Sequence, residues 1–177
     1  SASDFSQNWS NTGLITTNND WSAVPSIIGY RGDGLVGSTN VNPQTILAPS
    51  SVVNVIANQT NPNTLATGGI AEFEITNPVV ALQGSGTARA PHIVLHLNSA
   101  GRNDLKISYT LRDIDGSTDN SVQQVALQYR IGTMGNFINI PAGYVADASK
   151  GPSTVFDTMI MVDLPLACSN QDSLQIR

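Results

Sequence analysis

The chain has 177 residues, which is enough for one domain with a complete hydrophobic core. Only 12% of the residues are charged and the net charge is -5, which argues against a protein that binds nucleic acid by neutralising phosphates. Hydrophobic residues make up 40%, too many for general disorder, and no apolar run reaches the length of a membrane helix.

Short apolar runs recur along the chain and predict strands, whereas no segment predicts a helix. Some of these runs alternate apolar and polar residues, others are rich in β-branched residues, and segments rich in Gly, Pro and Asn separate them. This pattern predicts an all-β single domain over 1–177, an antiparallel two-sheet β-sandwich of jelly-roll type. The expected strands cover 27–28, 52–57, 71–76, 92–97, 105–112, 124–131, 137–140, 156–164 and 173–177.

The two clearest strands lie on either side of an acidic loop. In both strands apolar residues alternate with polar ones, so one set of side chains is expected in the core and the other in water. The expected core set is Leu105, Ile107, Tyr109, Leu111, Val125, Leu127, Tyr129 and Ile131. Because Asp115-Gly116 suits a tight turn, the sequence predicts that the two strands form an antiparallel hairpin.

The acidic loop between these strands is the best candidate ion site. Asp113, Asp115, Asp119 and Asn120 place carboxylate and amide oxygens in one short segment, and calcium prefers such ligands on a bent loop. The spacing does not match an EF-hand. The alternative is an ordinary turn in which the Asp side chains accept hydrogen bonds from backbone amides.

Aromatic residues in or beside predicted loops are candidates for ligand binding. Trp9, Trp21 and Tyr30 could stack on sugar rings, as exposed aromatic rings do in carbohydrate-binding sandwiches. The alternative is that the tryptophans close the ends of the hydrophobic core. We expect one of them to belong to the core and leave the other open.

Two pairs of polar residues share a strand face but do not indicate a catalytic site. His92 and His96 are four residues apart, roughly 13 Å along a strand, which is too far for one zinc ion. We expect these histidines to be exposed or at a sheet edge. Glu72 and Glu74 have a spacing compatible with a glycosidase pair, yet a solvent-facing pair of glutamates is much commoner.

Five pieces of the chain stand out together: NTGLI (11–15), IGYRGD (28–33), VLHLN (94–98), YTLRDID (109–115) and VALQYR (125–130). They resemble a β-sandwich module of large secreted bacterial proteins. Such modules often accompany extracellular endonuclease or phosphoesterase domains, lamin-tail-like domains and surface sorting signals. The resemblance spans nearly the whole chain but implies no firm activity. Similar modules continue past Arg177 into one more strand, which leaves open whether this chain lacks its last strand.

The low charge and high Asn and Thr content also favour a secreted or cell-surface protein. No signal peptide begins the chain, so a secreted chain would be in its mature form. We therefore expect a non-catalytic extracellular binding or adhesion module, stabilised by calcium, whose partner is a surface polysaccharide or another protein chain.

Two alternatives remain open. In the first, the chain is a structural subunit that assembles into a fibre or layer by pairing exposed strand edges. In the second, it is an accessory domain of a secreted nuclease or glycoside-active enzyme. With two histidines on one predicted strand, the sequence offers no complete catalytic constellation for that enzyme.

Overall fold

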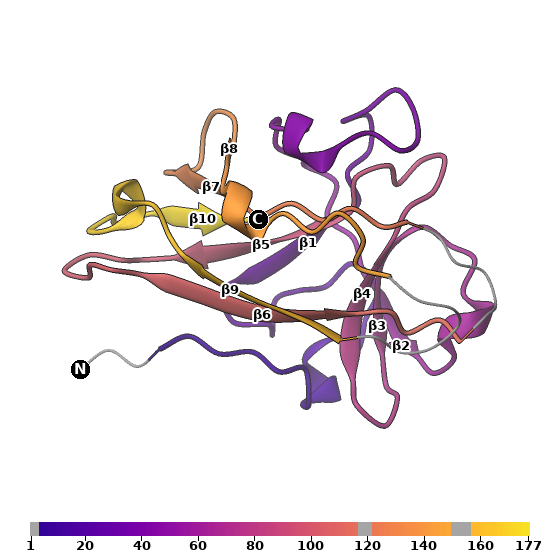
Figure 1. The fold of residues 1–177 in the computed structure, drawn as a ribbon. Coiled ribbons are helices and arrows are strands. Elements are labelled where there is room, and N and C mark those ends of the chain that lie inside the picture. Colours follow the sequence, from indigo (N-terminus) through magenta and orange to yellow (C-terminus); the bar gives the residue numbers. More distant parts are fainter. Residues whose placement is uncertain (1–3, 117–121, 150–156) are drawn as a thin grey trace.

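The computed structural model describes residues 4–116, 122–149 and 157–177. In this part of the chain the regular elements are short β-strands and single turns of 3-10 helix (Figure 1). The strands are β1 (Ile27–Tyr30), β2 (Ile56–Gln59), β3 (Gly69–Phe73), β4 (Val79–Gln83), β5 (His92–Leu97), β6 (Lys106–Arg112), β7 (Gln128–Ile131), β8 (Ile138–Asn139), β9 (Asp157–Asp163) and β10 (Leu174–Ile176). The helical turns are η1 (Thr12–Leu14), η2 (Pro43–Thr45), η3 (Pro62–Thr64), η4 (Pro141–Gly143) and η5 (Leu166–Cys168).

The strands form three sheets that pack together, which confirms the all-β sandwich prediction. The largest sheet has the order β1-β5-β10-β7-β8 and is antiparallel throughout. The second has the order β2-β3-β4, with β2 parallel to β3. The third is a two-stranded antiparallel ribbon of β6 and β9. A bridge between Tyr30 and Val53 connects the edge of the largest sheet to the segment before β2.

The prediction that the two strands beside the acidic loop form a hairpin is wrong. β6 pairs along its whole length with β9, from Lys106 opposite Asp163 to Arg112 opposite Asp157. β7 instead pairs with β10 and β8 in the largest sheet. The alternation in β9 complements β6 as well as that of β7 does, so the pattern alone could not select the partner.

The strand nearest the C-terminus lies inside the largest sheet. β10 is paired on one side with β5 and on the other with β7 (Figure 1). Residues Leu174–Ile176 therefore do not provide the open edge that a missing last strand would leave. In the described residues, the ribbon strands β6 and β9 each pair on one side only.

Two clusters of buried apolar residues form the core. The first fills the space between the ribbon and the inner face of the largest sheet, with Tyr129, Ile160 and Leu174 among its members. The second surrounds Trp21, which packs with Ile27 of β1 and Ile70 of β3. The inward positions that alternation predicted in β6 belong to the first cluster, so this part of the prediction is confirmed.

The opposite face of the largest sheet is also covered, contrary to the prediction that it faces water. Gln128, Arg130 and Gln175 point away from the apolar cluster, yet all three are buried. The segment from Asn42 to Ser50, here called the strap, crosses this face. Its backbone carbonyls accept hydrogen bonds from side chains of the sheet, including that of Gln128. Alternation therefore separates the two faces correctly but does not show which of them is exposed.

Gly29 allows the Trp21 ring to pack closely on β1. A Cβ atom at Gly29 would lie 2.3 Å from Cζ2 of Trp21 and 2.5 Å from Cδ1 of Ile70. We expect Gly29→Ala to lower the free energy of unfolding by about 1–3 kcal/mol, because the core must shift to accept the methyl group. Urea denaturation followed by tryptophan fluorescence measures this.

Gly84→Ala is the matched control. A Cβ atom at Gly84 meets no atom within 4 Å, so this substitution should change the free energy of unfolding by less than about 0.5 kcal/mol. Equal effects of the two substitutions would contradict the close packing inferred at Gly29.

Candidate binding site

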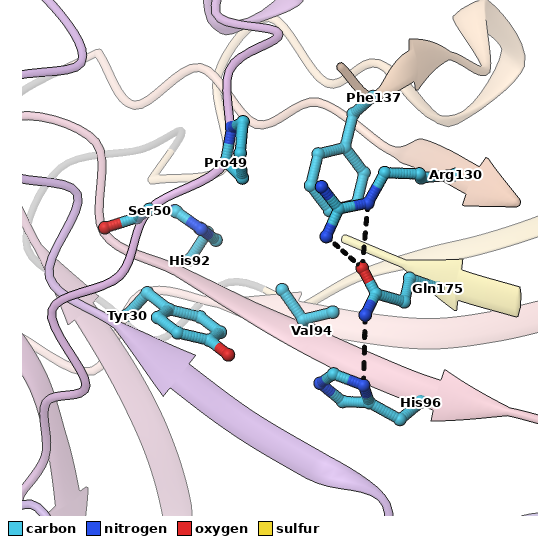
Figure 2. A pocket seen from close by; sticks show the side chains of 9 residues that line it. All are labelled: Tyr30, Pro49, Ser50, His92, Val94, His96, Arg130, Phe137 and Gln175. Carbon is cyan, nitrogen blue, oxygen red and sulfur yellow. Dashed lines mark hydrogen bonds between the residues drawn. The ribbon is translucent and has the colours of Figure 1, made fainter. Parts of the chain in front are cut away.

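A small pocket lies on the covered face of the largest sheet, between the sheet and the strap (Figure 2). We call it the Arg130 pocket. Its volume is about 30 Å³, enough for one or two atoms of a ligand or a water molecule. Its lining comes from β1, β5, β7, β10, the strap and the segment before β8: Tyr30, Pro49, Ser50, His92, Val94, His96, Arg130, Phe137 and Gln175.

A chain of hydrogen bonds across three strands fixes the polar wall of this pocket. His96, Gln175 and Arg130 are opposite one another on β5, β10 and β7. Nε of Arg130 donates to Oε1 of Gln175 at 2.9 Å, and Nη2 donates to the same oxygen. Nε2 of Gln175 lies 3.2 Å from Nδ1 of His96 (Figure 2).

This series of hydrogen bonds determines which nitrogen of His96 carries the proton. A guanidinium only donates, so the atom of Gln175 that faces Arg130 must be its carbonyl oxygen. The amide nitrogen of Gln175 therefore donates to Nδ1 of His96, and the proton of the neutral imidazole is on Nε2. Nε2 is buried and has no hydrogen-bond partner among the described residues. It is thus a donor without an acceptor.

Arg177 holds the strap against the sheet beside this pocket. Nη1 donates to the backbone oxygen of Ala48 at 2.8 Å, and Nη2 donates to that of Ile46. Nε donates to Oε1 of Gln128 at 2.8 Å, which leaves the amide nitrogen of Gln128 to donate to the strap. The guanidiniums of both Arg130 and Arg177 lie against the ring of Phe137, at 4.5 and 4.1 Å from its centroid.

Arg130 is buried and Arg177 is half-buried, and their positive charges have no carboxylate beside them in the described part of the chain. Among the residues that the structure describes, no carboxylate forms an ion pair with Arg130 or Arg177. Burial lowers the pKa of Arg130, and burial together with the Arg130 charge lowers the pKa of Arg177 to about 10. Both remain protonated at neutral pH. The pocket is therefore electropositive.

The two histidines are neither exposed nor at a sheet edge, so that prediction is wrong. β5 lies between β1 and β10, and the strap covers its outward face. The His92 ring stacks on Tyr30, and burial lowers the pKa of His92 to about 4. Nδ1 of His92 lies 2.8 Å from the backbone oxygen of Ala90, so it carries the proton.

A second candidate surface is the outer face of the β6–β9 ribbon. Met159 and Met161 are 76% and 71% exposed, and they lie opposite Thr110 and Ser108 of β6. Charged residues occupy the two ends of each strand, with Lys106 and Arg112 on β6 and Asp157 and Asp163 on β9. The outer face of β9 thus has an apolar centre between charged ends, the composition of many protein interfaces.

Both edges of this ribbon have backbone groups available for pairing. The backbone N–H of Leu164 donates to the carbonyl of Leu105 at 2.8 Å. In an antiparallel ladder every second pair is hydrogen-bonded, so the pairs next to them point their N–H and C=O groups outwards. Ser108, Thr110, Met159 and Met161 are at these outward positions. The exposed methionines and the free backbone of β9 therefore belong to the same residues.

The predicted aromatic ligand-binding residues lie in three different settings. Trp21 is only 5% exposed, and its Nε1 donates to the backbone oxygen of Asn54, so it is a core residue. Trp9 is half-buried and packs edge-on against Trp21. Tyr30 lines the Arg130 pocket instead of lying on an open surface. The structure does not bring the three rings together into one platform.

The structure describes only part of the predicted calcium loop. The backbone N–H of Asp115 donates to Oδ1 of Asp113 at 3.0 Å, as in an ordinary Asx turn. Asp119 and Asn120 lie outside the described residues. Within 4–116, 122–149 and 157–177, no three His, Cys, Asp or Glu side chains are close enough together to hold a metal ion. The calcium site stays a prediction.

Glu72 of β3 and Glu74, which directly follows the strand, differ in their surroundings. Glu72 is only 4% exposed, so the prediction that it faces solvent is wrong, whereas Glu74 is exposed. Oε2 of Glu72 accepts a hydrogen bond from the backbone N–H of Asn58. Burial raises the pKa of Glu72. Because β3 lies between β2 and β4 and is buried on both faces, its alternation had no exposed side.

Comparison of the chain with known protein families, proteins and structures found no match. No family model matches the chain, and neither a curated protein nor a solved structure matches it. In the described part of the chain, no helix has the length and apolar character that crossing a lipid bilayer requires. The resemblance to modules of secreted bacterial proteins therefore stays an expectation.

The buried, neutral state of His92 predicts a dependence of stability on pH. The pKa is about 4 in the folded chain and about 6.5 when unfolded, so the unfolded chain binds more protons between these values. Stability should therefore fall as pH decreases from 6.5 towards 4, with a His92 contribution of about 3 kcal/mol. Urea denaturation at a series of pH values measures this.

His92→Phe separates this contribution from that of the carboxylates. The phenyl ring keeps the stack on Tyr30 but does not titrate, so the variant should lose less stability than the wild type between pH 7 and pH 4. Identical pH profiles for the two proteins would show that His92 is not a buried neutral group.

Proposed function

We propose that the chain is a non-catalytic binding module that recognises an extended segment of another protein at the β6–β9 ribbon. The observation that carries this proposal is the exposure of Met159 and Met161 on a strand whose outer backbone groups have no partner among the described residues. A strand added there would gain backbone hydrogen bonds and apolar contacts together. Methionine adapts its shape readily to a partner.

The charges at the ends of β9 favour a partner segment with basic residues. Asp157 and Asp163 are exposed and lie six residues apart on the same face of the strand. β6, the neighbour of β9 in the ribbon, has Arg112 opposite Asp157 and Lys106 opposite Asp163. A segment with the same spacing of basic residues would complement the free edge of β9 in the same way. The net charge of -5 favours the approach of such a segment.

An extracellular location is part of this proposal. The low proportion of charged residues and the resemblance to modules of secreted bacterial proteins support it. In that setting the partner would be a neighbouring protein of the cell surface or of the same secreted assembly.

A synthetic peptide with the sequence of residues 105–112 tests the pairing at β9 directly. This peptide reproduces β6, with basic residues at both ends, and NMR titration against the labelled protein follows its binding. We expect chemical-shift changes to concentrate in 157–163. Met161→Lys should weaken the binding about fivefold, because it replaces an apolar cross-strand contact by a repelling charge.

Met134→Lys is the matched control. Met134 is 83% exposed on the turn between β7 and β8, away from the ribbon, so the same change there should leave peptide affinity unaltered. Absence of binding at millimolar peptide, or equal losses in both variants, would contradict the proposal.

Self-assembly of the chain is the second candidate. The basic ends of β6 in one copy complement the acidic ends of β9 in another, whereas two β9 strands would place Asp157 opposite Asp163. Edge pairing between copies would therefore join β6 to β9, a contact that does not close by two-fold symmetry and can propagate.

Light scattering after size-exclusion chromatography, in calcium and in chelator, separates the two candidates. A binding module should be a monomer at every concentration, and an assembling subunit should show a mass that rises with concentration and falls in high salt. If the loop with Asp113 and Asp115 binds calcium, the melting temperature should be higher in calcium than in chelator. Equal melting temperatures would overturn the calcium prediction.

A further inference from the structure

Three hydrogen-bond donors meet at the Arg130 pocket without an anionic acceptor. The guanidinium of Arg130 has five N–H groups, of which three donate to Gln175 and to the backbone oxygen of Gly135. One hydrogen on each terminal nitrogen has no acceptor among the described residues. Nε2 of His96 is a second such donor, and the hydroxyl of Tyr30 is the third.

These donors surround one space. Figure 2 shows the Tyr30 hydroxyl and the Arg130 guanidinium on opposite sides of Val94, and the Nε2 side of the His96 ring turned towards the side of Tyr30. Pro49, Ser50 and Phe137 close the pocket from the side of the strap. The arrangement is rigid, because Arg130 is bonded to Gln175, and Gln175 in turn to His96.

The charge of the pocket requires compensation. Arg130 is only 8% exposed, and Arg177 lies against the same Phe137 ring, so two positive charges share one poorly hydrated region. A buried charge is costly unless an opposite charge or hydrogen bonds stabilise it. The residues lining the pocket include no Asp or Glu.

We propose that the Arg130 pocket binds a small inorganic anion of the halide class, held by Arg130, the Tyr30 hydroxyl and Nε2–H of His96. The volume of about 30 Å³ suits one such ion. The ion neutralises part of the charge that Arg130 and Arg177 bring under the strap. Binding therefore stabilises the folded chain.

Replacing gluconate by chloride at constant ionic strength tests this. Gluconate is too large for the pocket, so only chloride should stabilise the folded protein by binding, and the melting temperature should rise with chloride concentration until the site is saturated. The same titration with bromide should give a similar rise. Identical melting temperatures in the two salts would overturn the proposal.

Tyr30→Phe tests the assignment to this pocket. The variant keeps the ring stack on His92 and removes one donor, so the chloride affinity should fall about tenfold, the loss expected for a hydrogen bond to a charged group. Tyr144→Phe is the control, because the Tyr144 hydroxyl bonds to Gln124 and does not line the pocket. Equal losses in both variants would contradict the assignment.

A crystal grown in bromide gives a test on the unaltered protein. An anomalous peak between Arg130 and Tyr30 would support the proposal. Density at that place without an anomalous signal would identify a water molecule and overturn it. This result does not depend on whether either tyrosine variant folds.

Discussion

Arg177 donates from all three guanidinium nitrogens, to the strap carbonyls of Ile46 and Ala48 and to the side chain of Gln128. These bonds satisfy backbone groups that would otherwise be buried without partners, and they orient Gln128 so that its amide also donates to the strap. The covered face of the largest sheet depends on this contact. Because the strap lies over it, Arg130 is buried, a pocket exists beneath Pro49 and Ser50, and the histidines of β5 are only partly exposed.

The strands themselves were predictable because local pattern determines them. Alternation places Ile107 and Tyr109 on the side of the apolar cluster, and the structure confirms it. The partner of β6 was not predictable, since pairing depends on which distant strand reaches it, and β9 presents the same alternation as β7. A contact between residues far apart in sequence leaves no local signal in either strand.

For a related reason, the sequence pattern does not reveal most of the candidate site. The sequence predicts His92 and His96 as exposed residues or residues of a sheet edge, because polar residues on alternate positions usually face solvent. The sequence does not indicate a site at Arg130 and Gln175, since a polar face that another segment covers has the same sequence pattern as an exposed one. A partial signal was present: Pro43 and Pro49 delimit a segment without strand character, the composition expected of a chain that crosses a sheet instead of joining it.

The central place of β10 also governs the order in which the chain can fold during synthesis. β5 and β7 are separated by about thirty residues of other structure and meet only through Leu174–Ile176. A ribosome-bound chain that has not yet exposed these residues holds two half-sheets with unsatisfied inner edges, which are open to pairing with other chains. The largest sheet is therefore completed only once β10 has been made, and until then the inner edges of β5 and β7 lack their partner strand.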